Sequence, residues 1–293
     1  MFIRILLGGI VASLFAMVIT LSIVNTGKTK DLDSRLAKAT AQIKEQEDTL
    51  QKLEEVVHAL AEKDKGHGGG HGGAPHWEYE GEMGPENWGK QFPTCAAGKS
   101  QSPLNIVGPF EKSTVALKPD YKPGVLKVLN NGHTIQVNVA PGNTLKVGND
   151  SYDLVQFHFH RPSEEQIDGK PMAMVAHMVH KSADGKLAVI GVLMRESAVQ
   201  NRTLWSIWKN MPAKEGPEVE VPGVSINPAT LLPESLAHYA YEGSLTTPPC
   251  TEGVKFFIMK APIGIQKEMI DSFPFKMNAR PVQPLNGRKI GAS

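Results

Sequence analysis

The pentapeptide Gln156-Phe157-His158-Phe159-His160 carries the most structural information in the chain. Successive side chains of a strand point to opposite faces, so the two histidines share one face and the two phenylalanines share the other. Two imidazoles spaced in this way, on Cα atoms roughly 6.6 Å apart, can converge on one metal ion. The pentapeptide therefore predicts a strand with one apolar face in the core and a metal-binding face opposite it.

A third histidine is needed to complete such a site, and His177 is the candidate. It follows His160 by 17 residues, which accommodates a strand end, a turn at residues 167–170 and a returning strand. The His-x-His pair is weak evidence by itself, and the third histidine strengthens it. Three neutral nitrogens with an open fourth position are typical of a catalytic zinc site. His180 should face away from His177, so we expect it to be a hydrogen-bonded structural residue.

Outward from the pentapeptide, short strand-like segments alternate with turns. Four segments have the two-residue alternation typical of strands: Thr134–Val139, Tyr152–His160, Met172–Ser182 and Leu187–Glu196. A turn is predicted at residues 130–132, and short helical patterns occur at Thr203–Met211 and Ile265–Phe273. Residues 76–293 are therefore expected to form one mainly β domain with short peripheral helices.

Composition limits the classes of protein that fit. Basic and acidic residues number 31 and 30, so the chain lacks the excess positive charge typical of nucleic-acid binding. Hydrophobic residues make up 41% of the chain, enough for a large core, and Gly and Pro account for 49 of 293 residues, which indicates many turns. Only two cysteines are present, so a metal ion must be held mainly by histidines or carboxylates.

Residues 1–27 are predicted to be a membrane anchor or a signal peptide. Residues 5–24 form an uncharged run of 20, and a helix of that length spans a bilayer core of about 30 Å. A cleavable signal peptide is the alternative, although its apolar stretch is normally only about 7–15 residues long. We favour a retained anchor, and either interpretation sends the rest of the chain across the membrane.

Residues 28–65 are predicted to form a coiled-coil helix. Charged side chains number 17 of 38 here, and apolar residues recur every seven positions in two seams, one of them at Leu36, Ile43, Leu50 and Val57. This period of about 3.5 residues favours self-association into a homo-oligomer, with a single solvated stalk helix as the alternative. Residues 66–75, rich in Gly and His, predict a flexible linker rather than a metal site, because ordering glycines costs entropy.

Beyond the histidines, several strings of residues resemble α-class carbonic anhydrases of the exported bacterial type. They run in chain order over essentially all of residues 76–293: His76–Tyr79, Gly84–Trp88, Gln101–Pro103, Asn131–His133, Gln156–His160, Pro162–Glu164, Ala176–His180 and Gly243–Cys250. The resemblance implies a large central, mostly antiparallel sheet. The transmembrane helix and the coiled-coil helix predicted above would precede this domain.

The resemblance also implies a cofactor and a reaction. Zinc would be held by His158, His160 and His177, with water or hydroxide as the fourth ligand. In this family the ion lowers the pKa of the bound water toward neutrality, so that hydroxide is available to attack CO2. The expected activity is the reversible hydration of CO2 to bicarbonate and a proton.

Two further residues match positions that orient the nucleophile in the family. The Thr246 hydroxyl would accept a hydrogen bond from the nucleophile and donate one to the Glu164 carboxylate, which is a positioning role.

Because CO2 is small and nonpolar, an apolar wall is expected beside the metal. The residues at the family's pocket positions are Val179, Val189, Leu245, Thr247 and Phe256, the last of which replaces the usual tryptophan.

Turnover also requires a path for the proton out of the site. His133 matches the family's proton-shuttle histidine, and its ordinary pKa of about 6.5 suits a relay near neutral pH. The intervening waters would be ordered by Tyr79, Asn131 and Gln136, at positions that match the family.

Ligand histidines need a hydrogen-bond partner for their second ring nitrogen. For the first two ligands the resemblance implies the Gln156 side chain and the backbone carbonyl of Asn278. For His177 the family places a glutamate two residues earlier, where this chain has Val175. We therefore expect His177 to lose its usual carboxylate partner, so that water, a backbone carbonyl or a nearby side chain would have to substitute.

The two cysteines bear on the compartment. Cys95 and Cys250 match the disulfide of exported bacterial relatives, with two buried thiols as the alternative. A disulfide forms in an oxidising compartment such as a periplasm. We expect an inner-membrane protein with its catalytic domain in the periplasm, or a protein released into the periplasm if the N-terminal segment is cleaved.

Two functional classes remain. The leading hypothesis is an active zinc carbonic anhydrase that acts on CO2 and bicarbonate. The alternative is a catalytically weakened protein of the same fold that serves as a binding or scaffold module. Only Val175 favours the alternative, because the three histidines, Thr246 and Glu164 are all present. The sequence therefore predicts an enzyme, with no nucleic-acid partner.

Overall fold

The computed structural model describes Thr40 and residues 75–293. The predicted membrane anchor, all of the coiled coil except Thr40 and all of the linker except Pro75 lie outside the described residues, so these three assignments stay predictions. In the part of the chain that is described, no helix is both long and apolar enough to cross a membrane.

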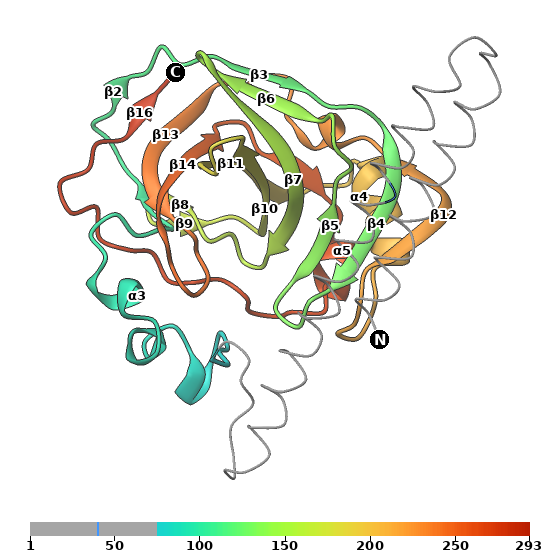
Figure 1. The fold of residues 1–293 in the computed structure, drawn as a ribbon, viewed down its shortest axis with the longest axis horizontal. Coiled ribbons are helices and arrows are strands. Elements are labelled where there is room, and N and C mark those ends of the chain that lie inside the picture. The colour runs from blue at the N-terminus through green and yellow to red at the C-terminus, as the bar shows by residue number, and fades with distance from the viewer. Residues whose placement is uncertain (1–39, 41–74) are drawn as a thin grey trace. The chain divides into compact units, whose positions relative to one another are not determined.

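A mixed β-sheet of 13 strands forms the body of the domain (Figure 1). Neighbouring strands follow the order β12 (Val219–Ile226), β4 (Gly124–Asn130), β5 (Ile135–Asn138), β7 (Asp150–His160), β10 (Met174–Ser182), β11 (Leu187–Glu196), β14 (Glu252–Met259), β13 (His238–Ser244), β16 (Gly291–Ala292) and β2 (Glu111–Lys112). Three further strands join this path: β6 (Thr144–Val147) on β7, β3 (Leu117–Asp120) on β6, and β15 (Ile263–Ile265) on β11.

The four strands predicted from side-chain alternation are confirmed as β5, β7, β10 and β11, with ends that agree to within two residues. In β7 the burial pattern follows this alternation in two stretches, at Tyr152 and Leu154 and again at Phe157 and Phe159, and His160 at the end of the strand is buried as well. The predicted turn at residues 130–132 lies between β4 and β5. Local side-chain pattern therefore accounts for the centre of the sheet.

Most neighbouring strands are antiparallel, as predicted, but the sheet also contains parallel joins. β11 pairs in parallel with β14 and with β15, and β16 pairs in parallel with β2. A parallel neighbour requires a crossover connection, and the chain between β11 and β14 passes through helix α4 (Arg202–Asn210), β12 and β13. The residues Ala188–Met194 of β11 are all buried, as is typical of a strand covered on both faces.

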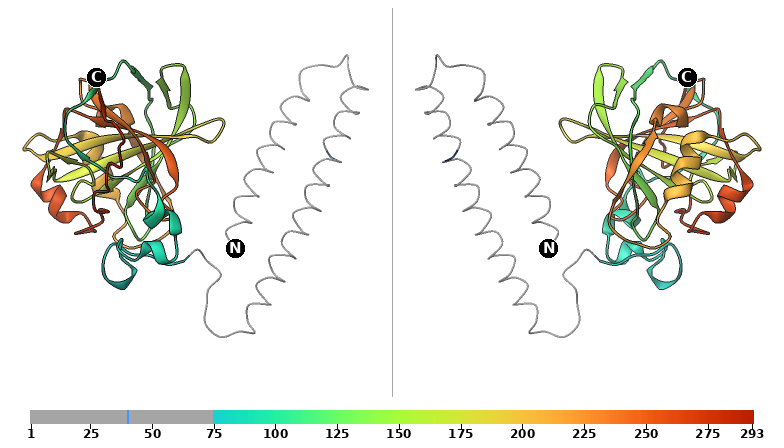
Figure 2. Two further views of the ribbon diagram at one scale, coloured as in Figure 1. Left: turned by 90° about the vertical axis from the view of Figure 1, so that its left-hand side faces the viewer. Right: turned by 90° about the vertical axis from the view of Figure 1, so that its right-hand side faces the viewer.

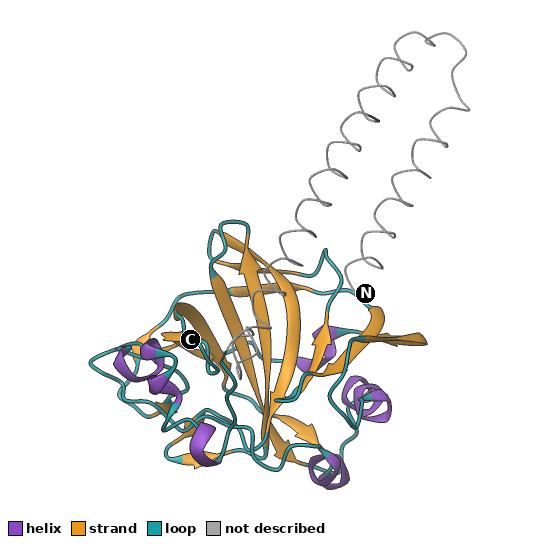
Figure 3. Ribbon diagram, turned by 60° about the horizontal axis from the view of Figure 1, so that its bottom comes forward, coloured by secondary structure: helices purple, strands orange, loops and turns teal. Residues whose placement is uncertain are grey.

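The helices within residues 75–293 are short and lie around the periphery of the sheet (Figures 2 and 3). They are α3 (Pro93–Ala97), α4 (Arg202–Asn210) and α5 (Lys267–Ser272), with 3-10 turns η2 (Gly81–Met83), η3 (Trp88–Lys90) and η4 (Pro228–Leu231). The predicted helices at 203–211 and 265–273 correspond to α4 and α5. Helix α4 begins after Asn201, whose side chain accepts the N–H of Leu204, and it buries Leu204 and Ile207.

A small second sheet holds the loop that follows β7. It consists of β1 (Asn105–Ile106), β8 (Gln166–Ile167) and β9 (Lys170–Pro171), with β1 and β8 parallel. The predicted turn joins β8 to β9, and its residues Asp168 and Gly169 have positive φ angles of 50° and 77°. This turn reverses the chain toward β10, so the loop residues just before β8 are fixed beside the central strands.

Two apolar clusters cover opposite faces of the central strands. The larger cluster includes Phe157 and Phe159 of β7 and Met178 of β10. The smaller cluster includes Val175 of β10 and Phe256 of β14. Since Val175 and His177 are two residues apart on one strand, they share a face, and the smaller cluster lies on the face that carries the histidines.

Candidate active site

Three histidines meet on neighbouring strands, as predicted. His158 and His160 lie on β7, and His177 lies on β10 directly opposite His158. The ring centroids are 5.0 Å apart for His158 and His160, 5.7 Å for His158 and His177, and 4.9 Å for His160 and His177. One ring nitrogen from each lies within 4.8 Å of the other two. The three imidazoles thus surround one point.

Each of the first two ligands has its second ring nitrogen bound to the predicted partner. The Nδ1 of His158 lies 2.9 Å from Oε1 of Gln156, and the Nδ1 of His160 lies 2.7 Å from the backbone carbonyl oxygen of Asn278. These oxygens accept a hydrogen bond from Nδ1–H, which leaves Nε2 of each ring free as a ligand atom. Nε2 of His160 is buried and has no hydrogen-bond partner among the described residues, as a metal-binding nitrogen would.

His177 lacks its usual carboxylate partner, as expected, and the structure shows which of the three expected substitutes takes its place. Its Nε2 lies 3.1 Å from both carboxylate oxygens of Glu165, a fully buried residue. A nearby side chain therefore substitutes for the glutamate that Val175 replaces. Glu165 was not predicted as a site residue, and its only signal in the sequence is the pair of adjacent glutamates at 164 and 165.

Metal binding requires neutral imidazoles, and the surroundings favour that form for two of the three histidines. Burial lowers the pKa of His158 to about 3 and holds the pKa of His160 well below its ordinary value. Burial also lowers the pKa of His177, but the carboxylates of Glu165 and Glu164 outweigh it and raise the pKa overall. A cation placed between the three rings would therefore meet two neutral imidazoles and a third paired with negative charge.

These residues fit a zinc ion. Three imidazoles are the donor set of an open, water-activating zinc site, and each ring here has one nitrogen oriented by an acceptor and one left for the metal. A zinc ion held by His158, His160 and His177 would act as a Lewis acid that activates water.

Glu164 lies beside the histidines and is oriented by the backbone. Its Oε1 accepts the N–H of Arg280 at 2.8 Å, and its buried Oε2 lies 3.4 Å from Nε2 of His160. Burial raises the pKa of Glu164 to about 7, while the neighbouring Thr246 hydroxyl acts to lower it. The structure thus brings Thr246 and Glu164 together at the metal site, as predicted.

An apolar wall adjoins His177. Val189 and Phe256 are buried in the smaller cluster, with Val179 and Leu245 packed against them. The ring of Phe256 lies 6.0 Å from that of His177. Four of the five predicted pocket residues therefore form one apolar surface, and the fifth, Thr247, is half-buried next to Thr246.

His133 lies outside this wall, on the turn between β4 and β5. Its ring stacks on Trp77, with centroids 3.8 Å apart and planes inclined by 11°. Burial is the main cause that lowers the pKa of His133. Tyr79 lies between His133 and the metal site, with its ring 6.4 Å from that of His133 and 6.5 Å from that of His160.

Polar side chains connect the predicted proton path to the zinc ligands. Asn131 accepts the backbone N–H of His133 through Oδ1 at 3.0 Å, and its Nδ2 donates to Gln136 at 3.4 Å. The side chain of Asn278 donates to the carbonyl oxygen of His133 at 3.0 Å, while its own carbonyl oxygen holds His160. Asn278 therefore contacts both His133, the predicted proton shuttle, and the ligand histidine His160.

Cys95 and Cys250 form the predicted disulfide, with Cα atoms 5.0 Å apart. The N–H of Cys250 donates to the carbonyl oxygen of Thr247 at 2.9 Å. The guanidinium of Arg280 donates to the carbonyl oxygen of Cys95 at 3.0 Å. The disulfide therefore braces both the segment that carries Thr246 and the residue whose backbone orients Glu164.

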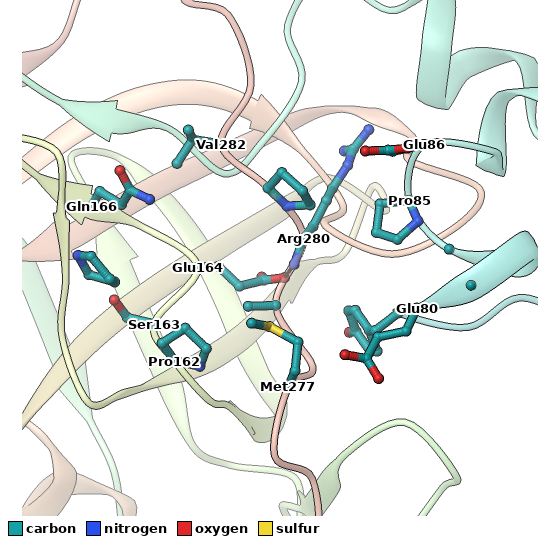
Figure 4. A pocket seen from close by; sticks show the side chains of 16 residues that line it. Glu80, Pro85, Glu86, Pro162, Ser163, Glu164, Gln166, Met277, Arg280 and Val282 are labelled. Carbon is teal, nitrogen blue, oxygen red and sulfur yellow. Dashed lines mark hydrogen bonds between the residues drawn. The ribbon is translucent and has the colours of Figure 1, made fainter.

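A cavity of about 600 Å³ borders the site on the side of Glu164 (Figure 4). Tyr79, Glu164 and Arg280 contribute to its wall, together with Glu80 and Met277. None of the three histidines lines this cavity in the described part of the chain. It is therefore a neighbour of the metal site rather than the metal site itself.

A buried three-histidine centre beside an apolar wall on a mixed sheet defines a water-activating zinc enzyme. Residues 83–293 match the family model described as eukaryotic-type carbonic anhydrase. The carbonic anhydrases of Pectobacterium carotovorum and Neisseria gonorrhoeae are 45% and 44% identical over 223 and 227 residues. These alignments cover 73% and 75% of this chain, and 90% and 89% of the relatives.

Solved structures agree with the sequence relatives. The α-carbonic anhydrase of Photobacterium profundum superimposes with a TM-score of 0.70 at 42% identity, covering 73% of this chain and 99% of that one. The chain belongs to the eukaryotic-type carbonic anhydrase family. It is a zinc enzyme that reversibly hydrates CO2 to bicarbonate and a proton.

Proposed function

We propose that His133, Glu164 and Thr246 serve catalysis in this carbonic anhydrase, and that the enzyme works outside the cytoplasmic membrane, tethered by residues 5–24. The observation that best supports an active enzyme is that each ligand histidine has a hydrogen-bond acceptor for its second ring nitrogen, which orients the ring toward the metal. The test is CO2 hydration by the purified chain as a function of its zinc content.

Thr246 and Glu164 position the nucleophile. The backbone N–H of Arg280 fixes one oxygen of Glu164, and the other oxygen faces the metal site without a hydrogen-bond partner among residues 75–293. When Thr246 donates its hydroxyl proton to that carboxylate, its oxygen can only accept from the nucleophile. The nucleophile then directs a lone pair at CO2, which rests against the wall of Val189 and Phe256.

The alternative of a scaffold protein loses its main support. It rested on Val175, which removes the usual carboxylate partner of His177. Because Glu165 contacts the same nitrogen, the ligand set keeps its full complement of oriented rings. The geometry therefore favours an active enzyme.

Export to a periplasm is supported by two independent features. The apolar run at residues 5–24 is long enough to span a bilayer. The disulfide between Cys95 and Cys250 requires an oxidising compartment, which the cytosol does not provide. We infer an inner-membrane protein whose catalytic domain faces the periplasm, joined to its anchor by residues 28–65 and by the linker at 66–75.

Replacing His133 by alanine should lower kcat at saturating CO2 by roughly tenfold and leave kcat/KM nearly unchanged. Export of the proton limits kcat, whereas the hydration step dominates kcat/KM. A positioned acid–base group contributes about 10²-fold or more, and buffer molecules that accept the proton reduce the observed loss in kcat. Stopped-flow hydration assays in dilute and concentrated imidazole measure both parameters. If both fall equally and imidazole restores nothing, His133 is not the shuttle.

A protein that begins at residue 28 is expected to form larger oligomers than one that begins at residue 75. The seven-residue apolar seams of residues 28–65 would be buried only by association. Multi-angle light scattering gives the number of protomers for each protein. Identical numbers would mean that residues 28–65 form a solvated stalk.

A further inference from the structure

Glu165 is a buried carboxylate that lies outside the strings of residues on which the resemblance rests. It is fully buried, and both of its carboxylate oxygens lie 3.1 Å from Nε2 of His177. Within residues 75–293, no lysine or arginine forms an ion pair with it. A buried charge without a partner is costly, so the contact with His177 accounts for its presence.

The backbone around Glu165 is held on both sides, so the position of its side chain is fixed. The Ser163 hydroxyl donates to the carbonyl oxygen of Glu165 at 2.7 Å. The next residue, Gln166, begins β8 and donates its N–H to the carbonyl oxygen of Leu104 at 3.2 Å. These hydrogen bonds hold the loop on both sides of Glu165 and so keep its carboxylate next to His177.

Val175 occupies the place on β10 from which the family's glutamate would reach the third ligand. Its side chain is fully buried in the smaller apolar cluster and offers no acceptor. The acceptor for His177 therefore comes from the loop before β8, not from the ligand's own strand.

We propose that Glu165 is the positioning residue of the third zinc ligand in this protein. Its carboxylate accepts the Nε2–H of His177, which keeps Nδ1 unprotonated and directed at the metal, and its charge strengthens that nitrogen as a donor. The inference rests on the proposed zinc site, because it concerns how one ligand of that site is held.

The adjacent glutamates then divide two tasks. Glu164 is tied to the N–H of Arg280 and faces Thr246, so it acts on the nucleophile. Glu165 faces the far side of the His177 ring, so it acts on the metal ligand. Two adjacent glutamates can serve one site because their side chains lie on opposite sides of the His177 ring. Glu164 lies 3.7 Å from Nδ1, and Glu165 lies 3.1 Å from Nε2.

The proposal predicts a graded effect on zinc release. Glu165→Leu removes the acceptor and its charge, and loss of such a partner typically costs about 10–100-fold in metal affinity or activity. Glu165→Gln keeps an acceptor oxygen in the same place but loses the charge, so it should release zinc faster than the wild type and more slowly than Glu165→Leu. Transfer of zinc from the loaded enzyme to excess dipicolinate gives the three rates.

Glu252→Gln is the matched control. Glu252 is a carboxylate of the same domain that accepts hydrogen bonds from the backbone N–H of Ser100 and from Gln101. Its replacement removes a hydrogen-bonded charge away from the ligands, so zinc release should stay at the wild-type rate. If Glu165→Leu does not fold, the Glu165→Gln rate decides the question against this control.

A spectroscopic measurement separates positioning from a merely structural role. In zinc-loaded protein labelled with ¹⁵N-histidine, the His177 proton should reside on Nε2 and exchange slowly with solvent, and its exchange should be much faster in Glu165→Leu. Wild-type protein that binds no zinc would contradict the proposed function itself. Zinc-loaded wild type and Glu165 variants with equal release rates would overturn only the role of Glu165.

Discussion

His158→Ala or His177→Ala is expected to abolish stoichiometric zinc binding and CO2 hydration together. Either change leaves two imidazoles for an ion that takes three protein ligands in open catalytic sites. Neither Gln156, the partner of His158, nor Glu165, the partner of His177, can replace the missing imidazole. Each contacts the ring nitrogen that faces away from the metal. Metal analysis and stopped-flow hydration on the same samples measure both losses, and full activity in either variant would refute the metal assignment.

His180→Ala provides the control for these two variants. His180 lies on the same strand as His177 but faces the opposite side, where its Nε2 contacts the Tyr121 hydroxyl at 2.6 Å and its Nδ1 contacts the carbonyl oxygen of Ala188 at 3.2 Å. Its loss should lower the free energy of unfolding by about 1–3 kcal/mol because buried polar groups are left unpaired. One zinc ion per chain should remain bound.

Thr246→Val is expected to lower kcat/KM by about 100-fold while zinc stays bound, since misplacement of a reacting group by about 1 Å can cost that much. Valine nearly matches threonine in shape but can neither accept from the nucleophile nor donate to Glu164. The nucleophile would then lose its orientation relative to CO2. The measurement is kcat/KM for hydration, normalised to the zinc content of each sample.

Thr246→Ser separates the hydroxyl from the shape of the side chain. Serine keeps the donor and acceptor, so this variant should retain most of the wild-type kcat/KM. Wild-type activity in Thr246→Val, with zinc bound, would show that Thr246 and Glu164 do not orient the nucleophile.

Strand alternation made the centre of this domain predictable. The Phe-His-Phe-His pattern at the end of β7 predicted both the core face and the metal face, and β11 was predicted with the observed ends. The position of His177 on a neighbouring strand was predicted because a turn and a returning strand fit between it and His160, and the structure adds its register opposite His158. These features depend on local periodicity and short connections, which a single sequence displays directly.

Features that depend on distant contacts could not be derived in this way. The carbonyl oxygen of Asn278 holds His160 across 118 positions of the chain, and only the resemblance suggested it. The parallel join of β11 and β14 depends on a crossover through several elements. The stacking of Trp77 on His133 likewise depends on how the N-terminal segment of the domain folds back.

Glu165 could not be identified as the partner of His177 from the sequence. The expected partner of His177 was sought two residues away, where an acceptor on β10 would be in reach. The actual partner is 12 positions earlier, on a loop whose course depends on the small sheet of β1, β8 and β9. Its side-chain direction becomes apparent only when that sheet is in place.

Metal removal and reconstitution of the purified chain is the measurement that tests the central claim most directly. Zinc is withdrawn with a chelator and then added back in known amounts while CO2 hydration is recorded. The three-histidine site predicts that hydration disappears with the metal and returns in proportion to added zinc, reaching a plateau at one ion per chain. Hydration that persists in the metal-free protein, or a chain that binds one zinc ion and stays inactive, would contradict it.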